Sequence, residues 1–216
     1  MDSVTDPFAL DGQENETDTG ETGRRILSNA LALFLEFGLK RTSMDDVARR
    51  AGVGRVTVYR HYGDKDALFQ AVVLRECRRA MRDIQSQLEA VASAEDYFVE
   101  SFVLVVNGVR RHPLIQRLLQ TEPEWLLPHI TLRFEPVFRL ALGYARYYFE
   151  QHLDEGYFQG LDLDFAGELL VRLVQSSVLS PGFMLAPERD EDLRRAARML
   201  VGMLLQASAG RSNIHL

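Results

Sequence analysis

The side chains best suited to specific chemistry lie between positions 55 and 65, and they suit binding rather than catalysis. Arg55 can pair with guanine O6 and N7, and the methyl groups of Val56 and Thr57 can contact thymine. The Tyr59 hydroxyl can donate to a phosphate, and Lys65 would stand in the first turn of a helix, where free N–H groups also attract phosphate. These residue types favour a surface that binds double-stranded DNA.

No pattern typical of an enzyme or a metal site is present in the sequence. It has no Walker loop, no Rossmann glycine fingerprint, no zinc-ligand spacing and no nucleophile elbow. The five histidines form no i, i+4 pair, and Asp162-x-Asp164 is better explained as a helix cap than as a metal site. We therefore expect no catalytic residues, no metal and no cofactor.

Composition places the chain among soluble globular proteins. Apolar residues make up 46% of the 216 residues and charged residues 26%. No apolar run approaches the roughly 18 residues that a membrane span needs. The lone Cys77 cannot form an intrachain disulfide, and the N-terminus does not resemble a signal peptide. We expect a cytoplasmic protein without a membrane partner.

Three short helical patterns would position the candidate DNA-binding side chains. Apolar residues recur at helical spacing over 24–37, and Ser43 with Asp46 forms the capping pair of a second helix. Gly52 supplies the positive φ of a tight turn. The third helix should run from about Arg55 to Tyr62 with Val58 turned inward. Together these patterns predict a helix-turn-helix.

Residues 24–69 resemble the DNA-binding domain of the tetracycline-repressor (TetR) family of bacterial regulators. The similarity rests on an ordered series of short motifs: Phe34-x-x-Phe37-Gly38, Thr42-Ser43, Val47-Ala48-x-x-Ala51-Gly52-Val53, Thr57-Val58-Tyr59-x-His61-Tyr62 and Lys65-x-x-Leu68. The resemblance implies that Thr42 and Ser43 touch phosphate, that Arg55, Val56 and Thr57 face bases, and that Tyr59, His61 and Lys65 contact the DNA backbone. Gly54 departs from the family pattern, which often has a polar residue there, so one phosphate contact is in doubt.

The charges are segregated along the chain, although the net charge is −6. Residues 1–23 carry seven acids and neither Lys nor Arg, whereas residues 24–65 carry nine bases and four acids. A basic module between acidic neighbours is typical of a DNA-binding domain joined to another domain. We expect residues 1–23 to be a disordered acidic tail, because they have too few large apolar groups to form a core.

The remainder of the chain predicts an all-α protein. One long helix is expected from Asp64 to about Ala92, and it would link the DNA-binding domain (24–69) to a C-terminal helical domain (70–216) that binds an effector and dimerises. Further helices are expected over 93–111, 114–120, 130–154, 162–179 and 187–207, with residues 121–128 mainly a loop. The last two would pair with those of a second subunit in a four-helix bundle, which the resemblance also implies, or would simply complete the core.

Aromatic residues are dense between positions 97 and 149. Singly they indicate core packing, but as a group they could line a cavity for a small apolar effector. The candidates are Phe102, Trp125, Phe138 and Tyr147.

The sequence thus favours a homodimeric transcriptional regulator that binds operator DNA, most simply a repressor released by a hydrophobic ligand. Two alternatives from other classes are a helical enzyme and a dimeric helical interaction module without DNA binding. The missing catalytic pattern weighs against the first, and the basic block from Arg24 to Lys65 weighs against the second.

Overall fold

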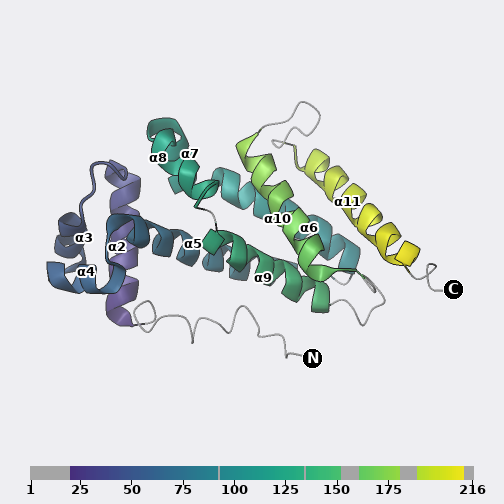
Figure 1. Ribbon diagram of the computed structural model, residues 1–216, viewed down its shortest axis with the longest axis horizontal. Coiled ribbons are helices and arrows are strands. Elements are labelled where there is room, and N and C mark those ends of the chain that lie inside the picture. Colours follow the sequence, from purple (N-terminus) through teal and green to yellow (C-terminus); the bar gives the residue numbers. More distant parts are fainter. Residues whose placement is uncertain (1–19, 92, 134, 152–160, 181–188, 212–216) are drawn as a thin grey trace. The chain divides into compact units, whose positions relative to one another are not determined.

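The computed structural model describes residues 20–91, 93–133, 135–151, 161–180 and 189–211, with side chains described as far as residue 206. This part of the chain is helical between its turns and loops, which confirms the predicted all-α class (Figure 1). It divides into two compact units. Unit 1 runs to Arg79 and also takes in Arg111–Phe138, and unit 2 consists of Ala80–Arg110 and the described residues from Arg139 onward.

Unit 1 contains the helix-turn-helix together with two helices from later in the chain. Its helices are α2 (Glu21–Phe37), α3 (Met44–Ala51), α4 (Arg55–Tyr62), the first part of α5 (Lys65–Leu88), α7 (Pro113–Thr121) and α8 (Pro123–Ile130). Residues 21–23, expected in the acidic tail, form the first turn of α2, and Gly23 is buried. Residues 1–19 of that tail lie outside the described part of the chain.

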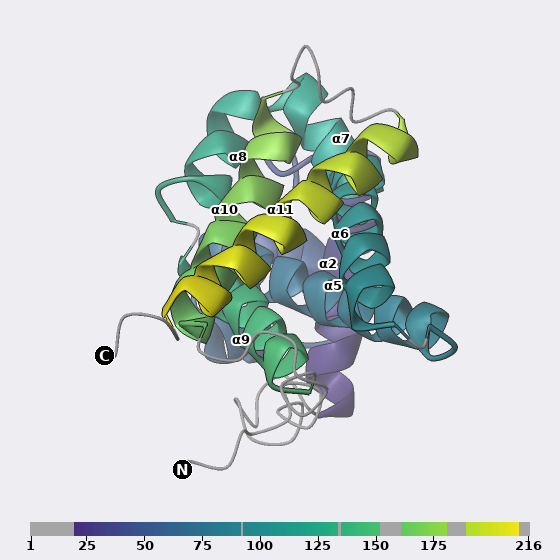
Figure 2. The ribbon, with the colours of Figure 1, turned by 90° about the vertical axis from the view of Figure 1, so that its right-hand side faces the viewer.

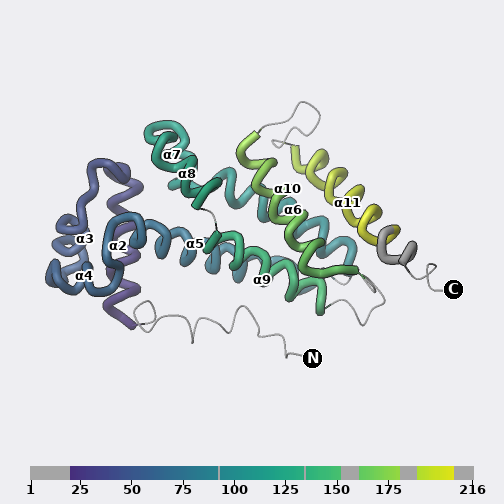
Figure 3. The backbone as a smooth tube through the Cα atoms, viewed as in Figure 1, coloured from purple at the N-terminus to yellow at the C-terminus, as the bar shows by residue number. Residues whose placement is uncertain are grey.

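The local structure of the helix-turn-helix follows from its caps. The Ser43 hydroxyl accepts from the Asp46 N–H, and the Asp46 carboxylate accepts from the Ser43 N–H, so the predicted capping box is present. Gly52 ends α3 at φ 64°, a left-handed conformation that glycine adopts without strain. The chain therefore turns sharply from α3 into α4 (Figure 3).

The core of unit 1 joins the predicted DNA-binding domain to a segment far away in sequence. Phe34, Val58 and Phe69 are buried together with Leu118 of α7 and Leu126 of α8. The Phe69 ring stands edge-on to Trp125, with ring centroids 4.6 Å apart. The compact unit thus extends beyond the predicted boundary at residue 69, because α7 and α8 complete its apolar core.

Unit 2 is a second helical core. It is built from the end of α5, most of α6 (Ala94–Arg111), α9 (Glu135–Gln151) from Arg139 onward, α10 (Leu163–Leu179) and α11 (Asp190–Arg211). Figure 2 shows the last four of these together. Phe98 and Phe102 of α6, Phe149 of α9, Ala166 of α10 and Ala197 of α11 lie in one buried cluster. The Asp162 side chain caps α10 by accepting from the Phe165 N–H, so its predicted role as a helix cap is confirmed.

Several predicted boundaries were wrong. Residues 121–128 were expected mainly as a loop, but those from Pro123 onward lie in α8, because Pro123 occupies the first helical turn, where its missing N–H costs nothing. The helix expected from residue 130 starts only at Glu135, and the long helix expected to reach residue 92 ends at Leu88. Among the residues the structure describes, none of the helices combines the length and the apolar character needed to cross a membrane.

Candidate nucleic-acid interface

Helix α4 separates its side chains into a buried and an exposed face. Val58 is fully buried and Tyr62 is 7% exposed, whereas Val56 is 79% exposed and Tyr59 39% exposed. An isolated valine so exposed on a short helix contributes little to the stability of unit 1, since apolar groups stabilise a fold by leaving water. The predicted division of the helix, with Val58 inside and Val56 outside, is therefore present.

Arg55 is held in place on this exposed face. Its Nε lies 2.9 Å from a carboxylate oxygen of Asp45 on α3, and its Nη2 lies 3.5 Å from the Tyr59 hydroxyl. The guanidinium carbon also stands 5.2 Å from the centre of the Tyr59 ring. The hydrogen bond with Tyr59, followed by the charge of Asp45, raises the pKa of Arg55. The side chain is thus oriented and charged before any ligand arrives.

The two predicted phosphate contacts at the start of α3, Thr42 and Ser43, differ in their exposure to solvent. Ser43 is exposed, and its hydroxyl donates to Asp46 over 2.6 Å; this hydrogen bond is the main reason that the pKa of Asp46 is lowered. Thr42 is 2% exposed, and its hydroxyl donates to the carbonyl oxygen of Gly38 over 2.7 Å. We correct the prediction for Thr42, because a buried hydroxyl that serves the preceding loop cannot reach a phosphate.

Lys65 has a structural task that the sequence did not indicate. Its Nζ donates to the carbonyl oxygens of Leu39 (3.0 Å) and Thr42 (3.4 Å), so it ties the start of α5 to the loop between α2 and α3. The side chain is half-buried. An ammonium group has three donors, so one N–H remains available for a phosphate at this position.

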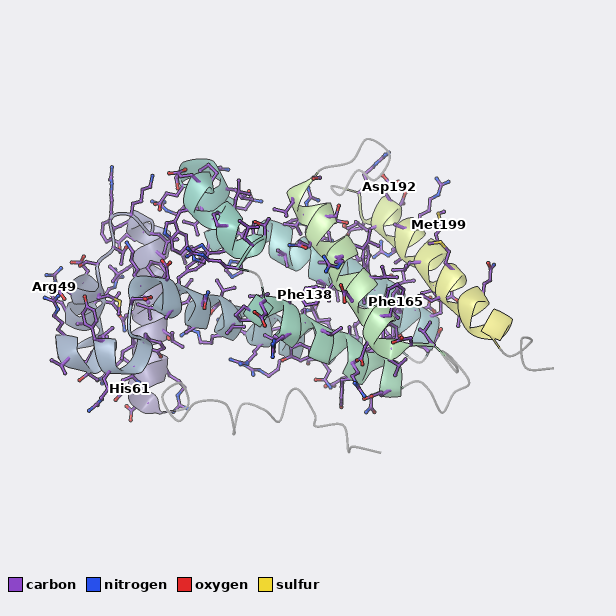
Figure 4. The ribbon with its side chains drawn as sticks, in the orientation of Figure 1. Arg49, His61, Phe138, Phe165, Asp192 and Met199 are labelled. Atoms are coloured by element: carbon purple, nitrogen blue, oxygen red, sulfur yellow. The ribbon has the colours of Figure 1, made fainter. Side chains whose placement is uncertain are left out.

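The remaining predicted residues lie on or beside α4. Thr57 and His61 are half-buried, and the His61 ring lies 5.9 Å from that of Tyr62. Figure 4 shows His61 at the edge of unit 1. Gly54 precedes α4 without a side-chain cap, and a Cβ placed there would meet nothing closer than 3.7 Å. The space for a polar side chain therefore exists at Gly54.

The four predicted effector-pocket residues do not share one core. Trp125 packs in unit 1, where its ring stacks on His129 at 4.0 Å between centroids. Phe102 is buried in the core of unit 2. Phe138 and Tyr147 are half-buried on α9, and Phe138 is the last residue of unit 1. Trp125 therefore packs within unit 1, and its contact with a ligand stays a prediction.

Sequence reasoning missed the residues by which α7 and α8 join the DNA-binding helices. Glu122 is 6% exposed and accepts from the backbone N–H of Lys40 over 2.9 Å, while the Lys40 ammonium pairs with Glu124. Arg117 donates to the carbonyl oxygen of Glu36 over 3.2 Å. Partners more than eighty residues apart leave no local pattern in a sequence, so only the fold identifies them.

Comparison with known proteins agrees with this geometry. Residues 26–72 match the family described as bacterial regulatory proteins, tetR family. The HTH-type transcriptional regulator UidR of Escherichia coli K12 is 33% identical over 92 residues, which are 43% of this chain and 46% of UidR. An HTH-type transcriptional regulator of Mycobacterium tuberculosis, MT1294, is 27% identical over 187 residues, which are 86% of each chain.

A solved structure is similar in fold to this chain over both units. The transcriptional repressor QsdR of R. erythropolis superposes with a TM-score of 0.64 at 24% identity, over 85% of this chain and 93% of QsdR. The chain spans about half the length of several curated relatives that it matches, such as 53% of Rv2250c of M. tuberculosis. The family match includes the helix-turn-helix and its exposed helix α4. The helix-turn-helix of this chain, over residues 26–72, is therefore that of the tetR family of bacterial regulatory proteins.

Proposed function

We propose that this protein is a homodimeric transcriptional repressor that binds a near-palindromic operator and is released from it by a small apolar ligand. The observation that carries the proposal is the preoriented, charged Arg55 at the start of α4, on the face that also exposes Val56 and Tyr59. Helices of this size enter the major groove, where arginine can bond to guanine in two places.

DNA contacts around α4 would hold the helix in its groove. Ser43 at the start of α3 and the free N–H of Lys65 are the proposed phosphate donors, together with Tyr59 and His61 of α4. Asp45 now neutralises part of the Arg55 charge, and on binding DNA Arg55 would exchange this partner for a base edge. Such an exchange would favour sites with a guanine at this position, because at other base pairs Arg55 would stay paired with Asp45.

Dimerisation is supported by exposed apolar side chains on the two last helices. Phe165 and Leu169 of α10 are 61% and 42% exposed, and Met199 and Met203 of α11 are 61% and 58% exposed. Each pair is spaced i, i+4 and so lies on one face of its helix. Figure 4 marks Phe165 and Met199. Two such faces from each subunit form the four-helix bundle of the proposed dimer.

A ligand would act through unit 2, whose core is rich in aromatic rings. Tyr97 and Tyr148 stack at 5.1 Å between centroids, and Phe98 and Phe149 lie beside them. Phe102 and Tyr147 remain our candidates for ligand contacts on α6 and α9. Among proteins of similar fold, RolR is known in complex with resorcinol. A ligand could release the operator only by binding better to a subunit arrangement that does not fit DNA.

The decisive experiment replaces the two side chains that carry the proposal. The double variant Arg55→Ala, Tyr59→Ala should weaken binding to the operator by about a hundredfold or more, because it removes a bidentate base contact and a phosphate donor. Fluorescence anisotropy with labelled operator duplex measures the affinity, and sedimentation shows that the dimer persists. Arg79→Ala, which removes an exposed arginine of α5, is the matched control. Unchanged operator affinity in the double variant would refute the proposal.

A further inference from the structure

Unit 1 carries a surface groove that the proposed DNA contacts do not use. It lies at the C-terminal end of α2 and along α3, and it is lined by Leu33, Phe37, Arg41, Thr42, Asp46, Arg49 and Arg50. Phe37 is 45% exposed, although Phe34 of the same helix is fully buried. Figure 4 shows Arg49 at the outer edge of this unit. An exposed aromatic ring among arginines suits a partner that is both apolar and anionic.

The charges of the groove leave a surplus of positive charge. Arg49 pairs with Asp46, and Arg50 pairs with Glu36 at 2.6 Å. Arg41 is exposed and has no ion-pair partner among the described residues. Two of the three arginines are therefore paired, and Arg41 leaves one unpaired positive charge at the rim above the apolar floor of Leu33 and Phe37.

A segment of this chain has the complementary chemistry. Residues 1–19 contain six carboxylates and neither Lys nor Arg. Within them, the sequence Asp6-Pro7-Phe8-Ala9-Leu10-Asp11 places an aromatic and an aliphatic side chain between two acids. Its apolar centre matches the floor of the groove, and its acids match the rim.

The segment can reach the groove from its attachment point. The groove lies at the far end of α2, whose 17 residues extend about 25 Å from Gly20. Ten residues connect Leu10 to Gly20, and a chain of that length spans at most about 35 Å. The reach therefore exceeds the length of the helix that has to be passed.

We propose that the Asp6–Asp11 segment docks in this groove and competes there with DNA. Asp46 lines the groove and also binds Ser43, the proposed phosphate donor, over 2.6 Å. Carboxylates docked beside Arg41 would thus occupy the approach of the phosphates to the start of α3. The competition rests on the proposed DNA-binding function, whereas the docking itself does not.

The size of the effect follows from the tether. A short flexible tether gives an effective concentration in the millimolar range, and a contact of a few side chains binds with a dissociation constant of similar size or slightly less. If the groove is filled about four-fifths of the time, the apparent affinity for DNA falls about fivefold. The docked segment would then raise the protein concentration at which half of the operator is bound.

Photocrosslinking in the 216-residue chain tests the docking without DNA. With Phe8→p-benzoylphenylalanine, light should link residue 8 to peptides that contain residues 33–50, as mapped by mass spectrometry. The same probe at Val4, outside the motif, is the control and should link there much less. Phe37→Ser, a change at an exposed side chain, should suppress the Phe8 crosslink. Crosslinks that avoid residues 33–50, or that survive Phe37→Ser unchanged, would overturn the proposal.

Duplex affinity tests the competition. The double variant Phe8→Ser, Leu10→Ser keeps the net charge and should raise the affinity about fivefold at low salt. Glu14→Gln, Glu16→Gln removes two charges outside the motif and should change it less than about twofold. If the charge variant raises affinity and the apolar variant does not, the tail acts only by long-range repulsion and the groove proposal is wrong. If no variant binds duplex, the proposed function fails, while the crosslink still decides the docking.

Discussion

Lys65 combines an observed structural contact with a proposed DNA contact. Its ammonium group binds the carbonyl oxygens of Leu39 and Thr42, yet one donor remains for DNA. The resemblance to known regulators indicated only the DNA contact. The structural contact could not be predicted, because the carbonyl groups of a loop have no side-chain signature in the sequence.

Lys65→Met separates these two purposes. We expect it to weaken duplex binding about tenfold and to lower the salt slope of log K by about 1, because one phosphate contact is lost. We also expect a loss of about 1 kcal/mol in the free energy of unfolding, because two carbonyl groups lose a charged donor. Titrations at several salt concentrations and urea unfolding measure the two effects. A lower affinity with an unchanged salt slope would show that Lys65 only supports the fold.

At the scale of helices, the sequence predicted the helix-turn-helix closely. The predicted limits of α4, Arg55 and Tyr62, are those observed, since Gly54 and Gly63 bound it and Val58 and Tyr62 fix its inner face. Side-chain caps and glycine turns act over three or four residues, so a sequence records them.

Helices α7 and α8 were less predictable because their role depends on distant partners. Glu122 lies in a Pro- and Glu-rich stretch that predicts a loop. In the structure it is buried against Gly38, where a Cβ would collide with its carboxylate, and it accepts from the Lys40 N–H. A glycine at position 38 therefore both ends α2 and admits Glu122.

This contact predicts a clear difference between two neighbouring glutamates. Glu122→Ala should lower the free energy of unfolding by about 1–3 kcal/mol, because the Lys40 N–H loses its acceptor in a buried site. Glu124→Ala removes an ion pair whose side chains are 58% and 60% exposed, so its effect on the free energy of unfolding should be much smaller than that of Glu122→Ala. Urea unfolding followed by circular dichroism compares them. Equal losses for the two variants would contradict the structural role of Glu122.

At the scale of the whole molecule, the sequence predicted two functional parts but not how the chain divides between them. The compact units alternate along the chain, since residues 111–138 belong with the helix-turn-helix and residues 80–110 with the C-terminal helices. Periodicity reports which residues of a helix are buried, but not which other helix buries them. For the same reason Phe102 and Trp125, both predicted for one pocket, lie in different cores.

The proposed dimer is a property of the whole molecule, because it would bring two copies of α4 to one operator. Phe165→Glu with Met199→Glu places charges on the exposed apolar faces of α10 and α11, so the dimer should dissociate into folded monomers. Leu132→Glu, at an 89% exposed leucine of unit 1, is the control and should remain dimeric. Sedimentation equilibrium measures the mass and circular dichroism the helix content.

Loss of the dimer should lower the affinity for the operator. One subunit bound to its half-site holds the other at a high effective concentration, so a monomer should bind the operator about a hundredfold or more weakly. Its affinity for an isolated half-site should be unchanged, because α4 lies in unit 1, which the substitutions do not touch. A double variant that stays dimeric would place the interface elsewhere. A folded monomer with full operator affinity would instead show that operator binding does not require two subunits.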